Sequence, residues 1–118
     1  YNMVAGRSSV LYGDGSKTRD FVYVDDVVQA CLKAMLAKAG GVFNIGNGRE
    51  ISLKQIISAI KKAASEKFVY KIKPDRSGEV QRSVLNSQKA KKILGWRAKV
   101  KLTDGIRKTI EWAMEQKK

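Results

Sequence analysis

The chain of 118 residues has no histidine, one cysteine and one proline. Without histidine, a His-based catalytic relay and a histidine-ligated zinc site are excluded. The single cysteine, Cys31, cannot form an internal disulfide, which suits a reducing, cytoplasmic compartment. Because Cys31 lies in a stripe of apolar residues, we expect it to be a buried core residue and not a nucleophile.

Long hydrophobic runs are also missing. The purely apolar stretches, such as Phe21–Val24, are only a few residues long, whereas a membrane-spanning helix needs roughly 20. The first residues, Tyr1–Arg7, have neither an initiating methionine nor a charged leader before an apolar core, so they predict a truncated chain and not a signal peptide. We expect no membrane partner, and one domain with a modest core over residues 1–118.

The chain has few acidic residues for its number of basic ones, and the basic excess lies in the second half. The net charge is +13, and residues 54–118 carry eighteen Lys and Arg against six Asp and Glu, whereas residues 1–53 carry six against five. Such a basic surface can attract nucleic acid, an acidic membrane, a phosphorylated ligand or an acidic neighbouring domain. The lysines are dispersed and form no recognisable nucleic-acid-binding motif, which argues against a nucleic-acid-binding module.

Strand and helix patterns alternate along the chain. This alternation predicts an α/β fold, a small mixed domain of short strands and about four to five helices. β-branched and aromatic residues predict four strands, at residues 10–12, 21–24, 42–45 and 68–72. Strands this short form only a thin sheet, so we expect these residues to rest on further structure.

Apolar spacing and terminal signals predict the helices. The first follows Asp25 or Asp26, which can cap and charge-complement its start, and its predicted buried face comprises residues 27, 28, 31, 32 and 35. The later signals are a capping box of Ser52 and Gln55, an N-cap at Asn86, a stop at Gly95 and a start at Thr103 or Asp104. Two further residues, Trp96 and Trp112, are expected to pack in the core.

One arginine stands in a position that suits phosphate binding. Arg19 follows the glycine-rich turn Gly13–Ser16, where the chain re-enters a strand, so a planar cation is held on a rigid element. Arginine offers several N–H donors in a fixed fork and keeps its charge, which matches the oxygens of a diphosphate.

Three segments, at residues 11–27, 43–52 and 76–96, resemble nucleotide-sugar epimerases and dehydratases in their motifs, order and spacing. The motifs include Arg19-Asp20-Phe21-Val22-Tyr23-Val24-Asp25, Phe43-Asn44-Ile45-Gly46 and Arg76-Ser77-Gly78-Glu79. The resemblance is to the carboxy-terminal, substrate-binding part of these extended short-chain dehydrogenases, of the UDP-glucose 4-epimerase type. It implies the C-terminal portion of an extended Rossmann-type enzyme.

The resemblance also implies roles for five residues. Arg19 and Arg76 would hold the two phosphates of a UDP-sugar or another nucleoside diphosphate sugar from opposite sides. Glu79 would accept hydrogen bonds from the ribose hydroxyls, and Val10 and Tyr12 would face the base. The residues alone leave structural alternatives open: Arg19 pairing with Asp20, Asp25 or Asp26, Arg76 pairing with Asp75 or Glu79, and Tyr12 packing into the sheet.

The family's cofactor and catalytic motifs are missing from the sequence. It contains neither a Gly-x-x-Gly-x-x-Gly turn nor a Tyr-x-x-x-Lys pair. We therefore expect no catalytic, cofactor-binding or metal-binding residue on this chain, and NAD held by an absent amino-terminal Rossmann domain. The resemblance implies a homodimeric full-length enzyme, with this chain alone inactive. Epimerase, 4,6-dehydratase and UDP-glucuronate decarboxylase stay open, as does a structural interaction piece without catalysis.

Overall fold

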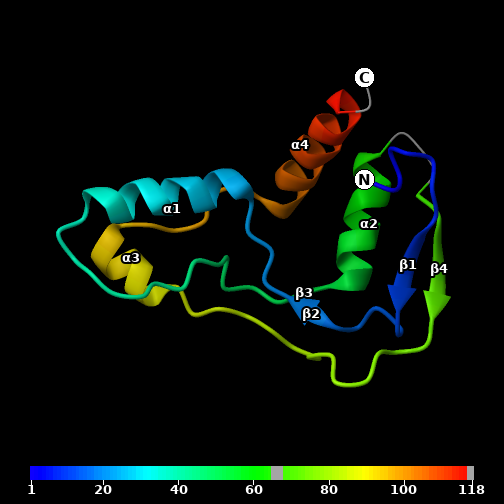
Figure 1. The fold of residues 1–118 in the computed structure, drawn as a ribbon, viewed down its shortest axis with the longest axis horizontal. Coiled ribbons are helices and arrows are strands. Elements are labelled where there is room, and N and C mark those ends of the chain that lie inside the picture. The colour runs from blue at the N-terminus through cyan, green and yellow to red at the C-terminus, as the bar shows by residue number, and fades with distance from the viewer. Residues whose placement is uncertain (65–67, 117–118) are drawn as a thin grey trace.

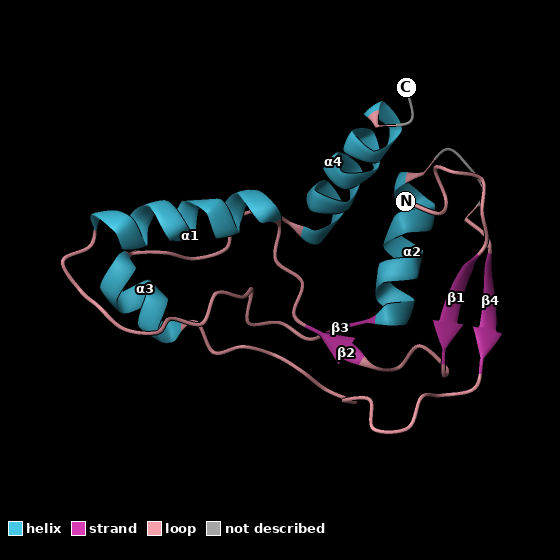
Figure 2. Cartoon of the chain, viewed as in Figure 1, coloured by secondary structure: helices cyan, strands magenta, loops and turns pink. Residues whose placement is uncertain are grey.

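The structure, a computed structural model, describes residues 1–64 and 68–116. In chain order their elements are β1 (Ser9–Tyr12), β2 (Thr18–Arg19), α1 (Val24–Leu36), β3 (Ile51–Ser52), α2 (Leu53–Ala63), β4 (Tyr70–Lys73), α3 (Gln88–Leu94) and α4 (Leu102–Glu115). Helices and short strands are mixed along the chain (Figure 2), so the predicted α/β class is confirmed. Within these residues, no helix combines the length and the apolar character that crossing a membrane requires.

The strands form two separate pairs. β1 and β4 run parallel, with Ser9 opposite Tyr70 and Tyr12 opposite Lys73. β2 and β3 run antiparallel, with Arg19 opposite Ile51. The second pair places Arg19 beside the strand that leads into α2. The first pair brings the chain that follows β4 to the glycine-rich turn after β1.

Two hydrophobic clusters lie at opposite ends of the molecule. Helices α1 and α3 lie together at one end, while α2, α4, β1 and β4 form the other (Figure 1). The first cluster is centred on Ala30, Ala90, Leu94 and Trp96, and the second on Met3, Val4 and Ala113. The radius of gyration is 16.5 Å, compared with about 13.5 Å for a closely packed chain of this length. The fold is therefore spread out, with long connections between its ends.

Local signals placed several helix ends correctly. The Ser52 hydroxyl accepts a hydrogen bond from the Gln55 N–H (3.2 Å), and the Gln55 side chain accepts one from the Ser52 N–H (2.7 Å), so the capping box is confirmed. Gly95 ends α3 with φ 59°, in the left-handed region that favours glycine. The prediction for Asn86 was one residue early: Ser87 is the N-cap of α3, although Asn86 Oδ1 accepts from the Gln88 N–H (3.0 Å).

Two predicted strands are absent from the described residues. Residues 21–23 are extended but belong to no strand, and Val24 already begins α1. The segment 42–45 likewise lies outside the strands. The aromatic and β-branched residues supply a preference for extended backbone, but a strand needs a hydrogen-bonded neighbour, and among the described residues the only strand pairs are β1–β4 and β2–β3.

The predicted buried face of α1 was wrong. Leu32 is 47% exposed and Met35 81% exposed, and Cys31 is also exposed, while the buried residues of the helix are Asp26 and Ala30. Asp25 and Asp26 lie in the first turn as expected, but neither caps the helix, whose N-cap is Tyr23.

The reason lies in the contacts of Asp26. Its carboxylate accepts hydrogen bonds from the N–H groups of Lys99 (3.0 Å) and Val100 (2.9 Å), and its carbonyl accepts one from the indole N–H of Trp96 (2.7 Å). These bonds hold the side of the helix that carries Asp26 and Ala30 inward. Trp96 is buried as predicted, whereas Trp112 is 57% exposed and does not belong to the core.

Candidate functional site

The turn after β1 and the segment after β4 lie against each other. Gly13 and Gly15 both have φ near 80° (77° and 80°), and the Asp14 carboxylate accepts hydrogen bonds from the N–H and the hydroxyl of Ser16. A Cβ on Gly13 would lie 3.2 Å from the Asp75 side chain. The glycine therefore permits both the turn and the close approach of the second segment.

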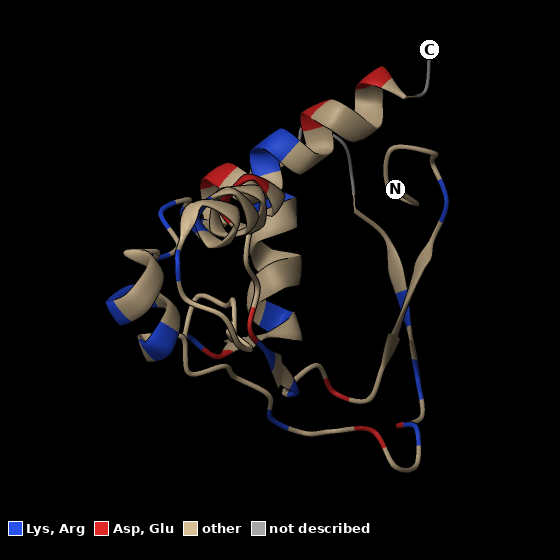
Figure 3. Ribbon diagram, turned by 60° about the vertical axis from the view of Figure 1, so that its left-hand side comes forward, with Lys and Arg blue, Asp and Glu red and all other residues tan. Residues whose placement is uncertain are grey.

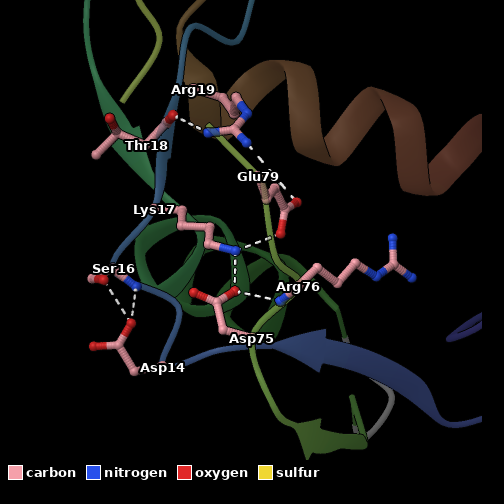
Figure 4. Close-up of polar contacts among 8 residues, drawn as sticks. All are labelled: Asp14, Ser16, Lys17, Thr18, Arg19, Asp75, Arg76 and Glu79. Carbon is pink, nitrogen blue, oxygen red and sulfur yellow. Dashed lines mark hydrogen bonds and ion pairs between the residues drawn. The ribbon is translucent and has the colours of Figure 1, made fainter. Parts of the chain in front are cut away.

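Lys17 is the most deeply buried charge of this site. Its side chain is 3% exposed, and its ammonium group donates to both Asp75 Oδ1 and Glu79 Oε2 (Figure 4). These bonds, to Asp75 first and then to Glu79, raise the pKa of Lys17, and Lys17 in turn lowers the pKa of Asp75. A buried charge needs such partners, so Lys17 fixes the second segment over the first.

Arg19 and Glu79, both predicted site residues, are neighbours. Arg19 Nη2 lies 3.9 Å from Glu79 Oε1, and Arg19 Nη1 donates to the Thr18 carbonyl (2.7 Å). About a third of each side chain is exposed (32% and 35%). Glu79 thus lies between Lys17 and Arg19, and the Arg19 guanidinium keeps N–H donors that can face a ligand.

Arg76 and Tyr12, two further predicted site residues, also lie together in the structure. The centre of the Arg76 guanidinium lies 3.6 Å from the centroid of the Tyr12 ring. The neighbouring Arg76 guanidinium lowers the pKa of Tyr12, and Tyr12 in turn raises the pKa of Arg76. A guanidinium stacked on an aromatic ring keeps its N–H donors in its own plane, where they can reach another acceptor. Figure 4 shows the Arg76 side chain extending away from Lys17 and Asp75, while its backbone N–H donates to Asp75 (2.9 Å).

Val10 lies at the margin of the site. It is 44% exposed and pairs with Lys71 in the β1–β4 ladder. Alternation along a strand places it on the same face as Tyr12. Sequence reasoning missed Lys17 and Asp75. Lys17 is 58 residues from Asp75 and 62 residues from Glu79 along the chain, and no local pattern links them.

A polar cavity of about 870 Å³ lies away from these residues. It is lined by residues 46–49, 84–88, 91 and 96–99, and includes the cations Arg49, Lys91, Arg97 and Lys99. None of the five predicted residues lines it. Lys and Arg also occur on many other elements (Figure 3). The cluster of Arg19, Arg76 and Glu79 instead lies on a partly open surface, since about a third of the Arg19 and Glu79 side chains is exposed.

Two glycine turns, Gly13–Gly15 and Gly46–Gly48, differ from the turn that binds a dinucleotide in a Rossmann domain. A Rossmann turn joins a strand to a helix and offers free N–H groups to the pyrophosphate, but Gly13–Gly15 joins β1 to β2. In the Gly46–Gly48 turn, the N–H groups of Asn47 and Gly48 already donate to Asp20. Neither of these two turns therefore has the arrangement of a Rossmann pyrophosphate turn.

Comparisons with known proteins agree with the resemblance in the sequence. The chain is 41% identical to a UDP-glucose 4-epimerase of Mycolicibacterium smegmatis over 111 residues, which cover 93% of this chain and 36% of that protein. It is similar to the structure of a Thermotoga maritima UDP-glucose 4-epimerase with UDP-glucose, with a TM-score of 0.87, 40% identity and coverage of 99% of this chain and 38% of that one. It also resembles a Bifidobacterium longum UDP-glucose 4-epimerase in complex with NAD+ and UDP, with a TM-score of 0.88, 28% identity and coverage of 98% and 38%.

The chain thus spans little more than a third of the length of these relatives, 36% of the Mycolicibacterium smegmatis protein. The family model described as GDP-mannose 4,6 dehydratase matches residues 1–109, most of the chain. The sequence match, the shared fold and the resemblance of the motifs agree: the chain belongs to this family of nucleotide-sugar epimerases and dehydratases.

Proposed function

We propose that this chain is the nucleotide-sugar-binding part of an NAD-dependent nucleotide-sugar epimerase, and that it binds a UDP-sugar. The main support is the pairing of two arginines with separate supports, Arg19 beside Glu79 and Arg76 stacked on Tyr12. The relative from Thermotoga maritima holds UDP-glucose and the one from Bifidobacterium longum holds NAD+ and UDP, which agrees with this ligand class.

The two arginines would bind the diphosphate. Each keeps a planar set of N–H donors, Arg19 from strand β2 and Arg76 from the loop after β4. Guanidinium groups match phosphate oxygens in geometry and make charge-assisted hydrogen bonds, which are stronger than neutral ones. Because Arg76 is stacked on Tyr12, less side-chain freedom would be lost when the ligand binds.

Glu79 would bind the ribose hydroxyls. Its Oε1 faces Arg19 and its Oε2 accepts from Lys17. A carboxylate offers about four acceptor positions, so both ion pairs leave room for two hydroxyl donors. Val10 and Tyr12 would line the side of the nucleotide nearest the β1 strand.

The chemistry would come from residues outside these 118. NAD, when bound, supplies reversible hydride transfer at a sugar carbon, and we assign its binding to an amino-terminal Rossmann domain of a longer, homodimeric protein. The residues of this chain would hold and orient the substrate. A dehydratase or a decarboxylase is the alternative outcome, because the family match covers nucleotide-sugar enzymes of more than one reaction.

Calorimetric titration of the chain with UDP tests the binding role. We expect saturable binding that Arg19→Ala and Arg76→Ala each weaken by about tenfold or more, the effect of losing roughly 1.4 kcal/mol. Arg107→Ala is the matched control, because Arg107 pairs with Glu111 on α4, away from the site. Absence of UDP binding, or an equal loss in the Arg107 variant, would contradict the proposal. Conversion of UDP-glucose to UDP-galactose by this chain with added NAD would show that the chemistry is not outside it.

A further inference from the structure

The residue after Arg19 joins three segments of the chain. Both oxygens of the Asp20 carboxylate accept backbone hydrogen bonds: Oδ1 from the Asn47 N–H (2.7 Å), and Oδ2 from the N–H groups of Gly48 (2.9 Å) and Leu85 (3.2 Å). The donors lie 27, 28 and 65 residues away along the chain. We call this arrangement the Asp20 clasp. The sequence left open an ion pair between Asp20 and Arg19. In the structure the Asp20 carboxylate instead accepts these backbone hydrogen bonds.

The clasp has little room for change. A Cβ on Gly46 would lie 2.6 Å from Asp20 Oδ2 and 2.9 Å from the Leu85 Cβ. The Ser87 hydroxyl accepts from the Gly46 N–H (3.1 Å) and donates to the Gly46 carbonyl (3.0 Å), which joins the same two segments a second time. The carboxylate is thus held in a tight set of donors, and the glycine is required for its close approach.

The clasp lies on one side of Arg19, and a second tether lies on the other. The Thr18 N–H donates to the Gln81 carbonyl (2.9 Å), while Asp20 binds the Leu85 N–H. Arg19 is therefore bracketed by two hydrogen bonds to the segment that directly follows Glu79. Any shift of this segment moves Glu79 relative to the Arg19 guanidinium.

We propose that Asp20 is a positioning residue of the nucleotide site: it holds Arg19 and Glu79 in register without touching the ligand. This inference rests on the proposed binding of a nucleoside diphosphate. A carboxylate that accepts three N–H groups at once makes charge-assisted bonds that an amide side chain cannot reproduce, because the amide has a single acceptor oxygen. Loss of the charge would free the segment after Glu79 and lower the affinity for UDP.

The test compares Asp20→Asn with Asp26→Asn in the full chain. Asp26 is a matched control, because its carboxylate also accepts two backbone N–H groups but joins α1 to residues 99 and 100, away from the site. We expect Asp20→Asn to weaken UDP binding by about tenfold, which corresponds to roughly 1.4 kcal/mol, and Asp26→Asn to lower the melting temperature with UDP affinity unchanged. Both titrations are made at a temperature where each variant is folded.

Two NMR readouts separate positioning from general loss of stability. In Asp20→Asn, the amides of Asn47, Gly48 and Leu85 should exchange with solvent faster than in the wild type, and the Arg19 Nε–H resonance should no longer shift when UDP is added. If Asp20→Asn does not fold, Ser87→Ala loosens the same junction and should weaken UDP binding by a smaller factor. UDP binding that both variants leave unchanged overturns the positioning role alone. Failure of the wild-type chain to bind UDP overturns the proposed function, and the positioning role with it.

Discussion

The charged centre, made of Lys17, Asp75 and Glu79, and the outer face of α1 differ in whether their side chains find partners within the chain. At the centre, Lys17 is 3% exposed and has two carboxylate partners. On α1, Met35 and Leu36 are more than four-fifths exposed (81% and 86%), and Val28 and Leu32 are about half exposed (48% and 47%). A buried charge without a partner costs free energy, whereas an apolar stripe left in water only forgoes the free energy that its burial would provide. Lys17 therefore finds its partners within this chain, whereas the apolar side chains on the outer face of α1 are not covered by the described residues.

The largest effect is expected on the inner side of α1. Trp96 is 2% exposed, belongs to the cluster with Ala30 and Leu94, and donates its indole N–H to the Asp26 carbonyl. Trp96→Ala should lower the free energy of unfolding by about 3–5 kcal/mol, through a cavity and a lost hydrogen bond. Urea unfolding followed by circular dichroism measures it. Trp112→Ala, at a residue 57% exposed, is the control, and an equal loss there would refute the assignment of the two clusters.

An intermediate effect is expected at the charged centre. Lys17→Met keeps the length of the side chain but leaves Asp75 and Glu79 without their cation. The variant should unfold at a lower urea concentration at neutral pH, because Asp75 and Glu79 then lose the ammonium group that they share and only Glu79 keeps a nearby cation, Arg19. Lys54→Met is a matched control: Lys54 is 63% exposed and lies 3.7 Å from Asp14, so its loss should have little effect. A Lys17 variant as stable as the wild type would show that the centre is not held by this ion pair.

The pH dependence follows from the shifted pKa values. The pKa of Lys17 is raised above its ordinary 10.5, so its contribution is complete below pH 10.5 and is lost as the pH rises through the higher folded value. The pKa of Asp75 is lowered below 3.8, so its contribution is complete above pH 3.8 and is lost as the pH falls through the lower folded value. Urea unfolding across this range should show stability falling at both ends, and both changes should be smaller in Lys17→Met.

The smallest effect is expected on the outer face of α1. Leu32→Gln should change the free energy of unfolding by about 0.5 kcal/mol or less, because the side chain it replaces is already half exposed. Cys31 on the same face should react with a thiol reagent in the folded chain as fast as a cysteine in an unfolded peptide. A strong loss of stability, or a protected Cys31, would mean that this face is covered in solution.

The helix ends show how much of the fold local sequence can predict. The capping box of Ser52 and Gln55 and the stop at Gly95 involve neighbours in the chain, and the structure contains both. The buried face of α1 could not be predicted in this way. Periodicity shows that one face is apolar, but the contacts of Asp26 with Lys99 and Val100 decide which face turns inward.

The same distinction applies to the site. Arg19 and Arg76 stand out because of their motifs, and the structure brings each beside another predicted site residue, Glu79 and Tyr12. Their roles in binding remain predictions. The contacts of Lys17 and Asp20 could not be predicted from the sequence, because their partners come from distant segments.

The parallel β1–β4 pair has a consequence for how the chain folds. Ser9 can meet Tyr70 only after the intervening chain has closed a long loop, and that closure costs conformational entropy before any contact compensates for it. Once the pair has formed, the contacts of Lys17 with Asp75 and of Asp20 with Leu85 close little additional chain. We therefore expect the proposed nucleotide site to form in the same slow, cooperative step as the strand pair, as is usual for contacts between residues far apart in sequence.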